Sequence, residues 1–113
     1  MESNIPPTGD EDNAGAPEVE IVCKFFSTLR TVVGTPEVTL TIPPNSTLGS
    51  ILEQVETRYF APKNAKFLAD DHTRLEVGVI CLIDDVDVNL AGGFKKKVTK
   101  PCTITLISSL HGG

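Results

Sequence analysis

Hydrophobic and mostly polar side chains alternate from Glu18 onward, which is the period-two pattern of a strand with one buried face. The first such stretch covers residues 18–25 and points four hydrophobic side chains to one side (Val19, Ile21, Cys23 and Phe25). The second covers residues 37–42, where hydrophobic side chains again take every second position (Val38, Leu40 and Ile42). Residues 29–34 turn the chain between them. The pattern therefore predicts a hairpin that is closed at or just before Gly34-Thr35-Pro36.

Hydrophobic residues that recur at helical spacing follow the second predicted strand. Asn45 and Ser46 are candidate N-cap residues for a helix over residues 47–60 that stops before Pro62. Five hydrophobic side chains recur on one side of that helix (Leu48, Ile51, Leu52, Val55 and Tyr59). We expect the stripe to face a core and the polar residues between to face water (Glu53, Gln54, Glu56, Thr57 and Arg58).

A long connection without a clear period follows the helix, over residues 61–77. Phe67 and Leu68 are the large hydrophobic residues that we expect to anchor it to the core. Residues 70–74, which include His72, are predicted to form an exposed turn.

Three further strands are predicted in the last third of the chain. Residues 78–83 are almost wholly hydrophobic, which is typical of a strand that is covered on both faces or nearly so. A short strand is expected over residues 86–90, and the last strand over residues 102–107, rich in β-branched residues. A helix with one hydrophobic stripe can cover one face of one sheet. The chain is therefore predicted to be an α+β domain in which one main helix packs across a mixed five-stranded sheet.

The expected domain covers residues 18–108. Residues 1–17 contain the acidic run Asp10-Glu11-Asp12 and little that could be buried, so we predict a disordered acidic N-terminal tail. That tail is expected to be a dispensable extension, with a docking role as the alternative. Residues 109–113 are predicted to be a flexible C-terminal tail.

The net charge and the cysteine content narrow the possible classes of function. The net charge of −5 argues against a broad basic face, so we expect no direct binding of nucleic acid or membrane. No hydrophobic run is long enough for a transmembrane helix, and the N-terminus lacks the hydrophobic core of a signal peptide. Cys23, Cys81 and Cys102 form no Cys-x-x-Cys pair and are expected to be reduced core residues of a cytoplasmic protein.

No pattern of catalytic or metal-binding residues stands out. Asp85, Asp87 and Asn89 imitate the start of a calcium-binding loop, but Leu90 stands where that loop needs glycine. His72 has no second histidine or cysteine at metal-ligand spacing. We therefore predict no metal site and no cofactor. The chain is expected to be no enzyme, and to supply a reacting group rather than an active site.

The candidate reacting group is the C-terminal carboxylate. The last predicted strand runs into Ser108-Ser109-Leu110-His111-Gly112-Gly113. Glycine adds nothing to a core, but its missing Cβ lets the backbone pass through a narrow channel. A carboxylate on such a slender tail is suited to activation by another protein.

This tail closely resembles the end of the ubiquitin-related modifier (Urm1) family, which closes on Ser-Thr-Leu-His-Gly-Gly; Ser109 replaces the threonine. Residues 79–90 resemble the family's hydrophobic strand, acidic turn and short strand. The resemblance implies the β-grasp (ubiquitin-like) fold, with the first and last strands side by side in the centre. Related sulfur carriers include MoaD and ThiS, and residues 25–34 are more like the first strand and turn of MoaD. MoaD, however, ends in Gly-Gly after a Pro-Pro segment that is absent here.

The resemblance implies a sulfur carrier. An E1-like activating enzyme with a rhodanese-type domain would adenylate Gly113 and convert it to a thiocarboxylate, reading Gly112, His111 and Leu110 on the way. The family passes this sulfur through a tRNA thiolase complex to the wobble uridine of tRNA, and can become attached to lysines of target proteins. The alternatives are a MoaD-like small subunit of molybdopterin synthase and a non-covalent ubiquitin-like interaction domain.

Overall fold

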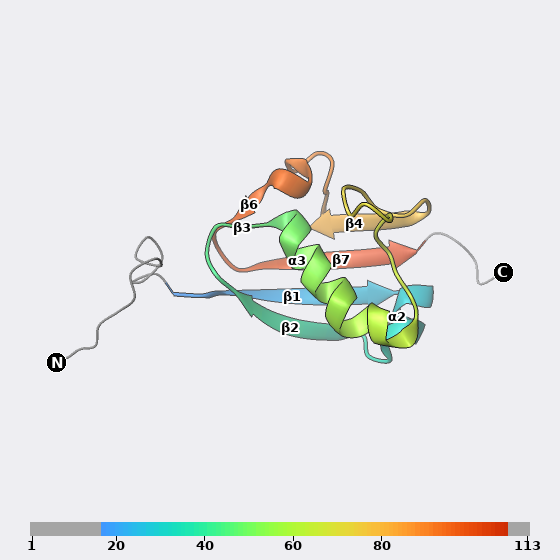
Figure 1. The fold of residues 1–113 in the computed structure, drawn as a ribbon. Helices are drawn as coiled ribbons and strands as arrows, with labels where there is room; N and C mark the ends of the chain where they lie inside the picture. Colours follow the sequence, from blue (N-terminus) through green and yellow to red (C-terminus); the bar gives the residue numbers. More distant parts are fainter. Residues whose placement is uncertain (1–16, 109–113) are drawn as a thin grey trace.

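The computed structural model describes residues 17–108. They form a five-stranded sheet with the strand order β2-β1-β7-β4-β5 (Figure 1). The strands are β1 Val19–Phe26, β2 Glu37–Ile42, β4 Val79–Ile83, β5 Val86–Asp87 and β7 Cys102–Ser108. A second, two-stranded sheet pairs β3 Ser46–Thr47 with β6 Lys97–Val98. The predicted α+β class and mixed five-stranded sheet are confirmed.

The first and last strands lie side by side in the middle of the sheet. β1 and β7 are parallel, in a register that runs from Ile21 beside Cys102 to Phe26 beside Ile107. β2 and β4 flank this pair and are antiparallel to β1 and β7, respectively. The central position that the resemblance implied for these two strands is therefore confirmed.

Helix α3, Leu48–Val55, crosses one face of the sheet (Figure 1). Its predicted stripe is confirmed for four side chains, which are buried (Leu48, Ile51, Leu52 and Val55). Tyr59, the fifth predicted member, is only partly buried, and Phe60 next to it is fully buried. The predicted N-caps are wrong, because Thr47 caps the helix with its side chain, accepting the Ser50 N–H at 3.2 Å. Ser46 instead donates its hydroxyl to the Pro43 carbonyl at 2.6 Å, and Asn45 has a left-handed backbone with a φ of 70°.

The predicted helical range of residues 47–60 is close to the observed one, but helical turns continue past Pro62, where a stop was predicted. Helix α3 continues as a π-helical turn, Glu56–Phe60, and then as a 3-10 turn, Ala61–Lys63, that ends at Asn64 in the left-handed conformation. Pro62 is tolerated because it lies in the first turn of this 3-10 segment, where a missing N–H costs little.

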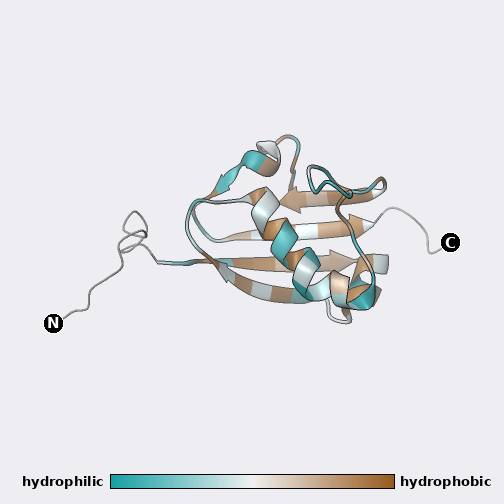
Figure 2. Cartoon of the chain, viewed as in Figure 1, coloured by the Kyte–Doolittle hydropathy of each residue, from teal (hydrophilic) through white to brown (hydrophobic). Residues whose placement is uncertain are grey.

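A single hydrophobic core lies between α3 and the sheet, and Figure 2 shows hydrophobic residues along the strands that face the helix. Three aromatic rings join the sheet, the helix and the long connection. Phe60 packs edge-on against Phe25 and Phe67, with ring centroids 5.8 Å and 4.9 Å apart. Phe67 and Leu68 are fully buried, which confirms that they anchor the connection.

Three other predictions of local structure need correction. The turn expected over residues 29–34 is a short helix, α2 Thr28–Val33, which Gly34 ends in the left-handed conformation. The strand expected over residues 86–90 stops at Asp87, whose carboxylate accepts the Asn89 N–H at 2.8 Å in a turn. β4 is not covered on both faces, since Ile80 is 38% exposed. The reason is that, within residues 17–108, one long helix covers one face of the sheet.

Glu56 was predicted to face water, and this is wrong as well. Its side chain is only 9% exposed, and its Oε2 atom accepts the N–H groups of Phe67 and Leu68, both at 2.8 Å. A buried carboxylate needs such partners. They come from the long connection, so Glu56 fastens that connection to the helix.

Candidate functional site

The predicted site residues Leu110, His111, Gly112 and Gly113 lie outside the described residues. The structure does define the strand from which they follow. β7 is held by hydrogen bonds on both sides, with Ser108 at its end opposite Val79 of β4. The segment that carries Gly113 therefore follows a strand that is paired on both sides and that ends at the right of Figure 1.

A hydrophobic patch lies on the sheet face that α3 leaves open. Side chains alternate between the two faces of a strand, so Phe26 points away from the core that holds Phe25. The register places Phe26, Ile107 and Ile80 abreast on β1, β7 and β4, with Leu82 two residues further along β4. Phe26 is 43% exposed and Ile80 38% exposed. We call Phe26, Ile80, Leu82 and Ile107 the open-face patch.

The position of the open-face patch gives it functional interest. Ile107 is the residue before Ser108, so the patch adjoins the point where residues 109–113 begin. Val77, just before β4, is 81% exposed and adds a further hydrophobic side chain at this end of the sheet. A contiguous hydrophobic surface of this kind is a common place for another protein to bind. The sequence did not reveal it, because the three strands come together only through the sheet register.

The three cysteines offer no reactive thiolate at neutral pH. Cys23 and Cys81 are buried, as predicted, whereas Cys102 is only partly buried. Burial is the main cause that raises the pKa of Cys81 to about 12 and of Cys102 to about 11. Burial is also the main cause that raises the pKa of Cys23, and the electrostatic interaction with Cys81 raises it further. Because nucleophilic sulfur is the thiolate, these residues are suited to a structural role.

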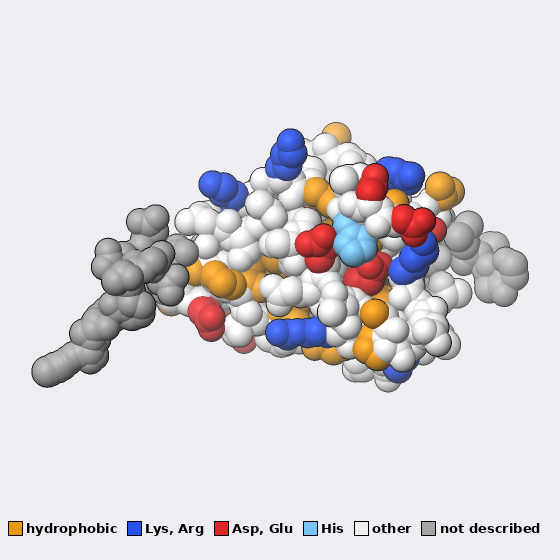
Figure 3. All heavy atoms as spheres, viewed as in Figure 1, with side chains coloured by type: hydrophobic (Ala, Val, Ile, Leu, Met, Phe, Trp, Pro, Cys, Tyr) orange, Lys and Arg blue, Asp and Glu red, His pale blue; other side chains and the backbone are white. Residues whose placement is uncertain are grey.

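His72 lies in the predicted exposed turn, but it is not isolated. Its Nδ1 atom is 3.1 Å from Glu53 Oε2, and its Nε2 atom is 3.3 Å from Glu56 Oε1. Figure 3 shows the histidine among acidic side chains on the helix-covered face. The contacts extend the Glu56 anchor to the surface, and we assign His72 a structural role.

Among residues 17–108, no group of three His, Cys, Asp or Glu side chains is placed to hold a metal ion. Over the same residues, no helix is long and hydrophobic enough to cross a bilayer.

Comparison with known proteins defines the class. The solved structure of the small archaeal modifier protein 1 (SAMP1) from Methanosarcina acetivorans superposes with a TM-score of 0.66 at 23% identity, covering 85% of this chain and 98% of that one. At this identity the likeness establishes the fold, which is the β-grasp of ubiquitin-like proteins.

Sequence comparison then defines the family. The family described as Urm1 (Ubiquitin related modifier) matches residues 20–113. A ubiquitin-related modifier 1 homolog from Drosophila simulans is 28% identical over 102 residues, which cover 88% of this chain and 99% of that relative. The homolog from Caenorhabditis elegans is 35% identical over 74 residues, which cover 64% of this chain and 74% of that relative. The chain belongs to the ubiquitin-related modifier family.

Proposed function

We propose that this protein is a sulfur carrier whose C-terminal Gly113 is activated by an E1-like enzyme. The observation that carries the proposal is the junction of three features: the Gly112-Gly113 terminus, the central strand β7 from which it follows, and the open-face patch beside that junction. In this reading residues 18–108 are the folded body, and residues 109–113 are the part that enters the enzyme.

The chemistry needs activation because a carboxylate is a poor electrophile. Attack of the Gly113 carboxylate on ATP releases pyrophosphate and forms an acyl-adenylate, in which AMP is a good leaving group. A persulfide on the enzyme or on its rhodanese-type domain then attacks the acyl carbon and AMP departs. Cleavage of the resulting acyl disulfide by a second thiol leaves the thiocarboxylate on Gly113.

The dimensions of the tail fit this role. Five residues span about 17 Å at about 3.4 Å per residue, enough to reach a recessed nucleotide site while the folded body stays outside. Gly112 and Gly113 bring no Cβ to that site. Leu110 and His111 are the first side chains that the enzyme could read. The open-face patch is the surface on which we place the body of the activating enzyme.

The thiocarboxylate is proposed to serve a tRNA thiolase complex, which would use it for 2-thiolation of the wobble uridine in the cytoplasm. Attachment of Gly113 to lysines of target proteins is the second proposed outcome, because the same acyl-adenylate can react with an amine. Direct binding of tRNA by the carrier is not part of this proposal.

A MoaD-like role in molybdopterin synthase is the second candidate, favoured by residues 25–34. That role would bury the C-terminal segment in a catalytic large subunit. Burial of Ser109 and His111 would cost about 1–3 kcal/mol for each polar group left unpaired. The match to the ubiquitin-related modifier family covers residues 20–113, nearly all of the folded body, and it favours the first candidate.

Exchange of pyrophosphate into ATP tests the proposal. Incubation with the E1-like enzyme of the same source should support exchange, and a chain that lacks Gly113 should not. The paired substitution Phe26→Ser with Ile80→Ser should weaken exchange through a higher KM, whereas Thr39→Ser with Thr41→Ser on the same open face should not. Failure of the unaltered chain to support exchange, with an enzyme that is active on another carrier, would leave the non-covalent interaction domain as the better account.

A further inference from the structure

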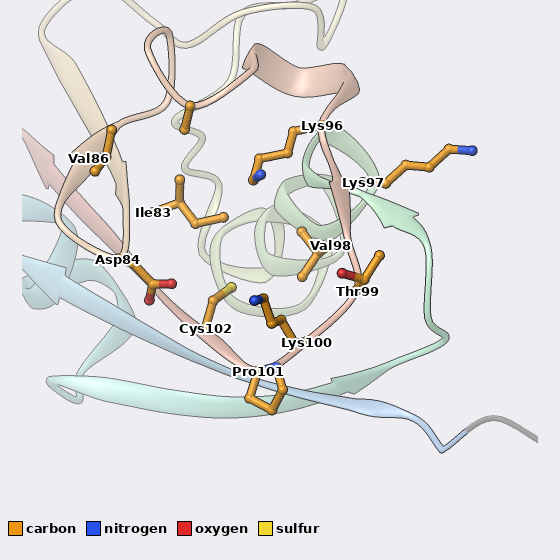
Figure 4. Close-up of a pocket in the computed structure, with 11 residues that line it drawn as sticks. Ile83, Asp84, Val86, Lys96, Lys97, Val98, Thr99, Lys100, Pro101 and Cys102 are labelled. Carbon is orange, nitrogen blue, oxygen red and sulfur yellow. The ribbon is translucent and has the colours of Figure 1, made fainter.

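A hollow of about 340 Å³ lies at the start of β7, at the opposite end of that strand from Ser108 (Figure 4). Its walls are hydrophobic and come from β4, β5, β6 and the segment before β7 (Ile83, Val86, Val98 and Pro101). The volume is in the range of sites that hold a small ligand or a few residues of peptide. The hollow shares no residue with the open-face patch, and its lining residue Ile83 points to the opposite sheet face from Leu82.

Two lysines give the hollow a positive charge. Lys96 extends into it and Lys100 lies beside Cys102, whereas Lys97 points away (Figure 4). Neither Lys96 nor Lys100 forms an ion pair with a carboxylate among residues 17–108. Asp84 is the acidic residue of the lining, and its Oδ1 atom accepts the Thr103 N–H at 2.9 Å. The hollow therefore suits an acidic segment that also carries hydrophobic residues.

The chain itself supplies such a segment at this end of the molecule. β1 and β7 are parallel and begin to pair at Ile21 and Cys102, so the chain enters the sheet beside the hollow. Figure 1 shows the start of β1 and the start of β7 on the same side. Residues 1–16, which lie outside the described residues, contain no Lys or Arg. They do contain Ile5-Pro6-Pro7 and four acidic residues (Glu2, Asp10, Glu11 and Asp12).

Reach and tethering favour this occupant over a separate acidic peptide. Asp12 precedes Pro17 by five residues, which can span about 17 Å at about 3.4 Å each. A segment on a short tether has an effective concentration on the order of millimolar, so a contact with a Kd near 1 mM is populated without any second molecule. Ion pairs at Lys96 and Lys100 are too weak to reach that strength alone, and burial of Ile5 on the hydrophobic wall is needed to supply the rest.

We propose that residues 5–12 bind the hollow of the same molecule, with Asp10-Glu11-Asp12 at Lys96 and Lys100 and Ile5-Pro6-Pro7 on the hydrophobic wall. The bound segment masks the lysine-rich surface from other polyanions. It leaves the end of β7 near Ser108 accessible. The assignment is independent of the chemistry proposed for Gly113.

Amide chemical shifts of the full-length protein test the assignment. In the full-length variant Asp10→Asn/Glu11→Gln/Asp12→Asn, shifts should change at residues 83–84 and 96–102 as well as beside the substitutions. In the variant Lys96→Glu/Lys100→Glu, they should change at residues 10–12. The matched control is Lys95→Glu, in the same basic run but outside the lining, which should leave residues 10–12 unaffected. High salt should abolish the difference between parent and neutralised variant at residues 83–84 and 96–102, because the Debye length falls from about 30 Å at 0.01 M to about 3 Å at 1 M.

Shift changes confined to the neighbours of the substituted residues would overturn the assignment. A difference at residues 83–84 and 96–102 that persists in high salt would overturn the electrostatic part of it. Changes at the hollow that grow with protein concentration would also contradict it, because they would mean that the segment of a second copy is the occupant.

Discussion

Replacement of Glu56 by alanine is expected to loosen the connection between the helix and β4 and to destabilise the whole domain. The Glu56 carboxylate accepts the backbone N–H groups of Phe67 and Leu68, and it also contacts His72. Alanine removes the acceptor without offering another. Both N–H groups belong to fully buried residues, so water cannot easily replace the lost partner.

The magnitude follows from these contacts. Each buried N–H left without an acceptor costs about 1–3 kcal/mol, so Glu56→Ala is expected to cost about 2–6 kcal/mol. Glu56→Gln keeps a carbonyl oxygen but loses the charge that strengthens both hydrogen bonds, and we expect about half that cost. A domain of this size loses about 4–8 °C of melting temperature per kcal/mol, so the alanine variant should melt at least about 8 °C lower.

Thermal unfolding and amide hydrogen exchange measure the effect. The matched control is Glu53→Ala, which removes the other contact to His72 from an exposed side chain and should cost about 1 kcal/mol or less. In the Glu56 variants, the amides of Phe67 and Leu68 should exchange faster than their counterparts in the control. Equal melting temperatures for Glu56→Ala and Glu53→Ala would refute the reasoning.

Three further predictions concern the open-face patch, a thiol and the glycine that ends α2. The Phe26→Ser/Ile80→Ser variant should melt at least about 8 °C below the parent, since each side chain is more than half buried, so pyrophosphate exchange is compared at a temperature at which both proteins are folded; an unchanged melting temperature would contradict this. Alkylation of Cys102 in the native protein should be slow at pH 7 and rise about tenfold per pH unit until pH 11, since burial raises its pKa to about 11; a rate independent of pH would contradict this. Gly34→Ala should lower stability by about 1 kcal/mol in urea unfolding, because the φ of 89° at this position is left-handed; a gain in stability would contradict that.

The elements that the sequence predicted well are those whose signal is local. Hydrophobic and polar residues alternate over residues 18–25, and this alternation indicates which face of the strand is buried. The hydrophobic stripe from Leu48 to Val55 does the same for the helix, so both elements could be predicted. The short helix α2 was missed because six residues give too little periodicity to separate a helix from a turn. The N-cap was misplaced because Asn45, Ser46 and Thr47 are all suitable types, and the pairing of β3 with β6 decides between them.

What the sequence could not predict depends on contacts between distant residues. Glu56 lies next to the hydrophobic stripe of the helix. No local sequence pattern indicates that its hydrogen-bond donors, the N–H groups of Phe67 and Leu68, are eleven and twelve residues away. The open-face patch needs the register of β1, β7 and β4 to bring Phe26, Ile80 and Ile107 together. The C-terminal Gly-Gly could be recognised without a fold, because its proposed chemistry belongs to the end of the chain.

Intact mass of the protein, purified from its own sulfur-replete cells under reducing conditions, tests the central claim most directly. A fraction of molecules should carry sulfur in place of one oxygen, and fragmentation should place that change on Gly113. The fraction should disappear from cells that lack the E1-like enzyme. Material that never shows the exchange of oxygen for sulfur, while the E1-like enzyme is present and active in the same cells, would contradict the assignment of this chain as a sulfur carrier.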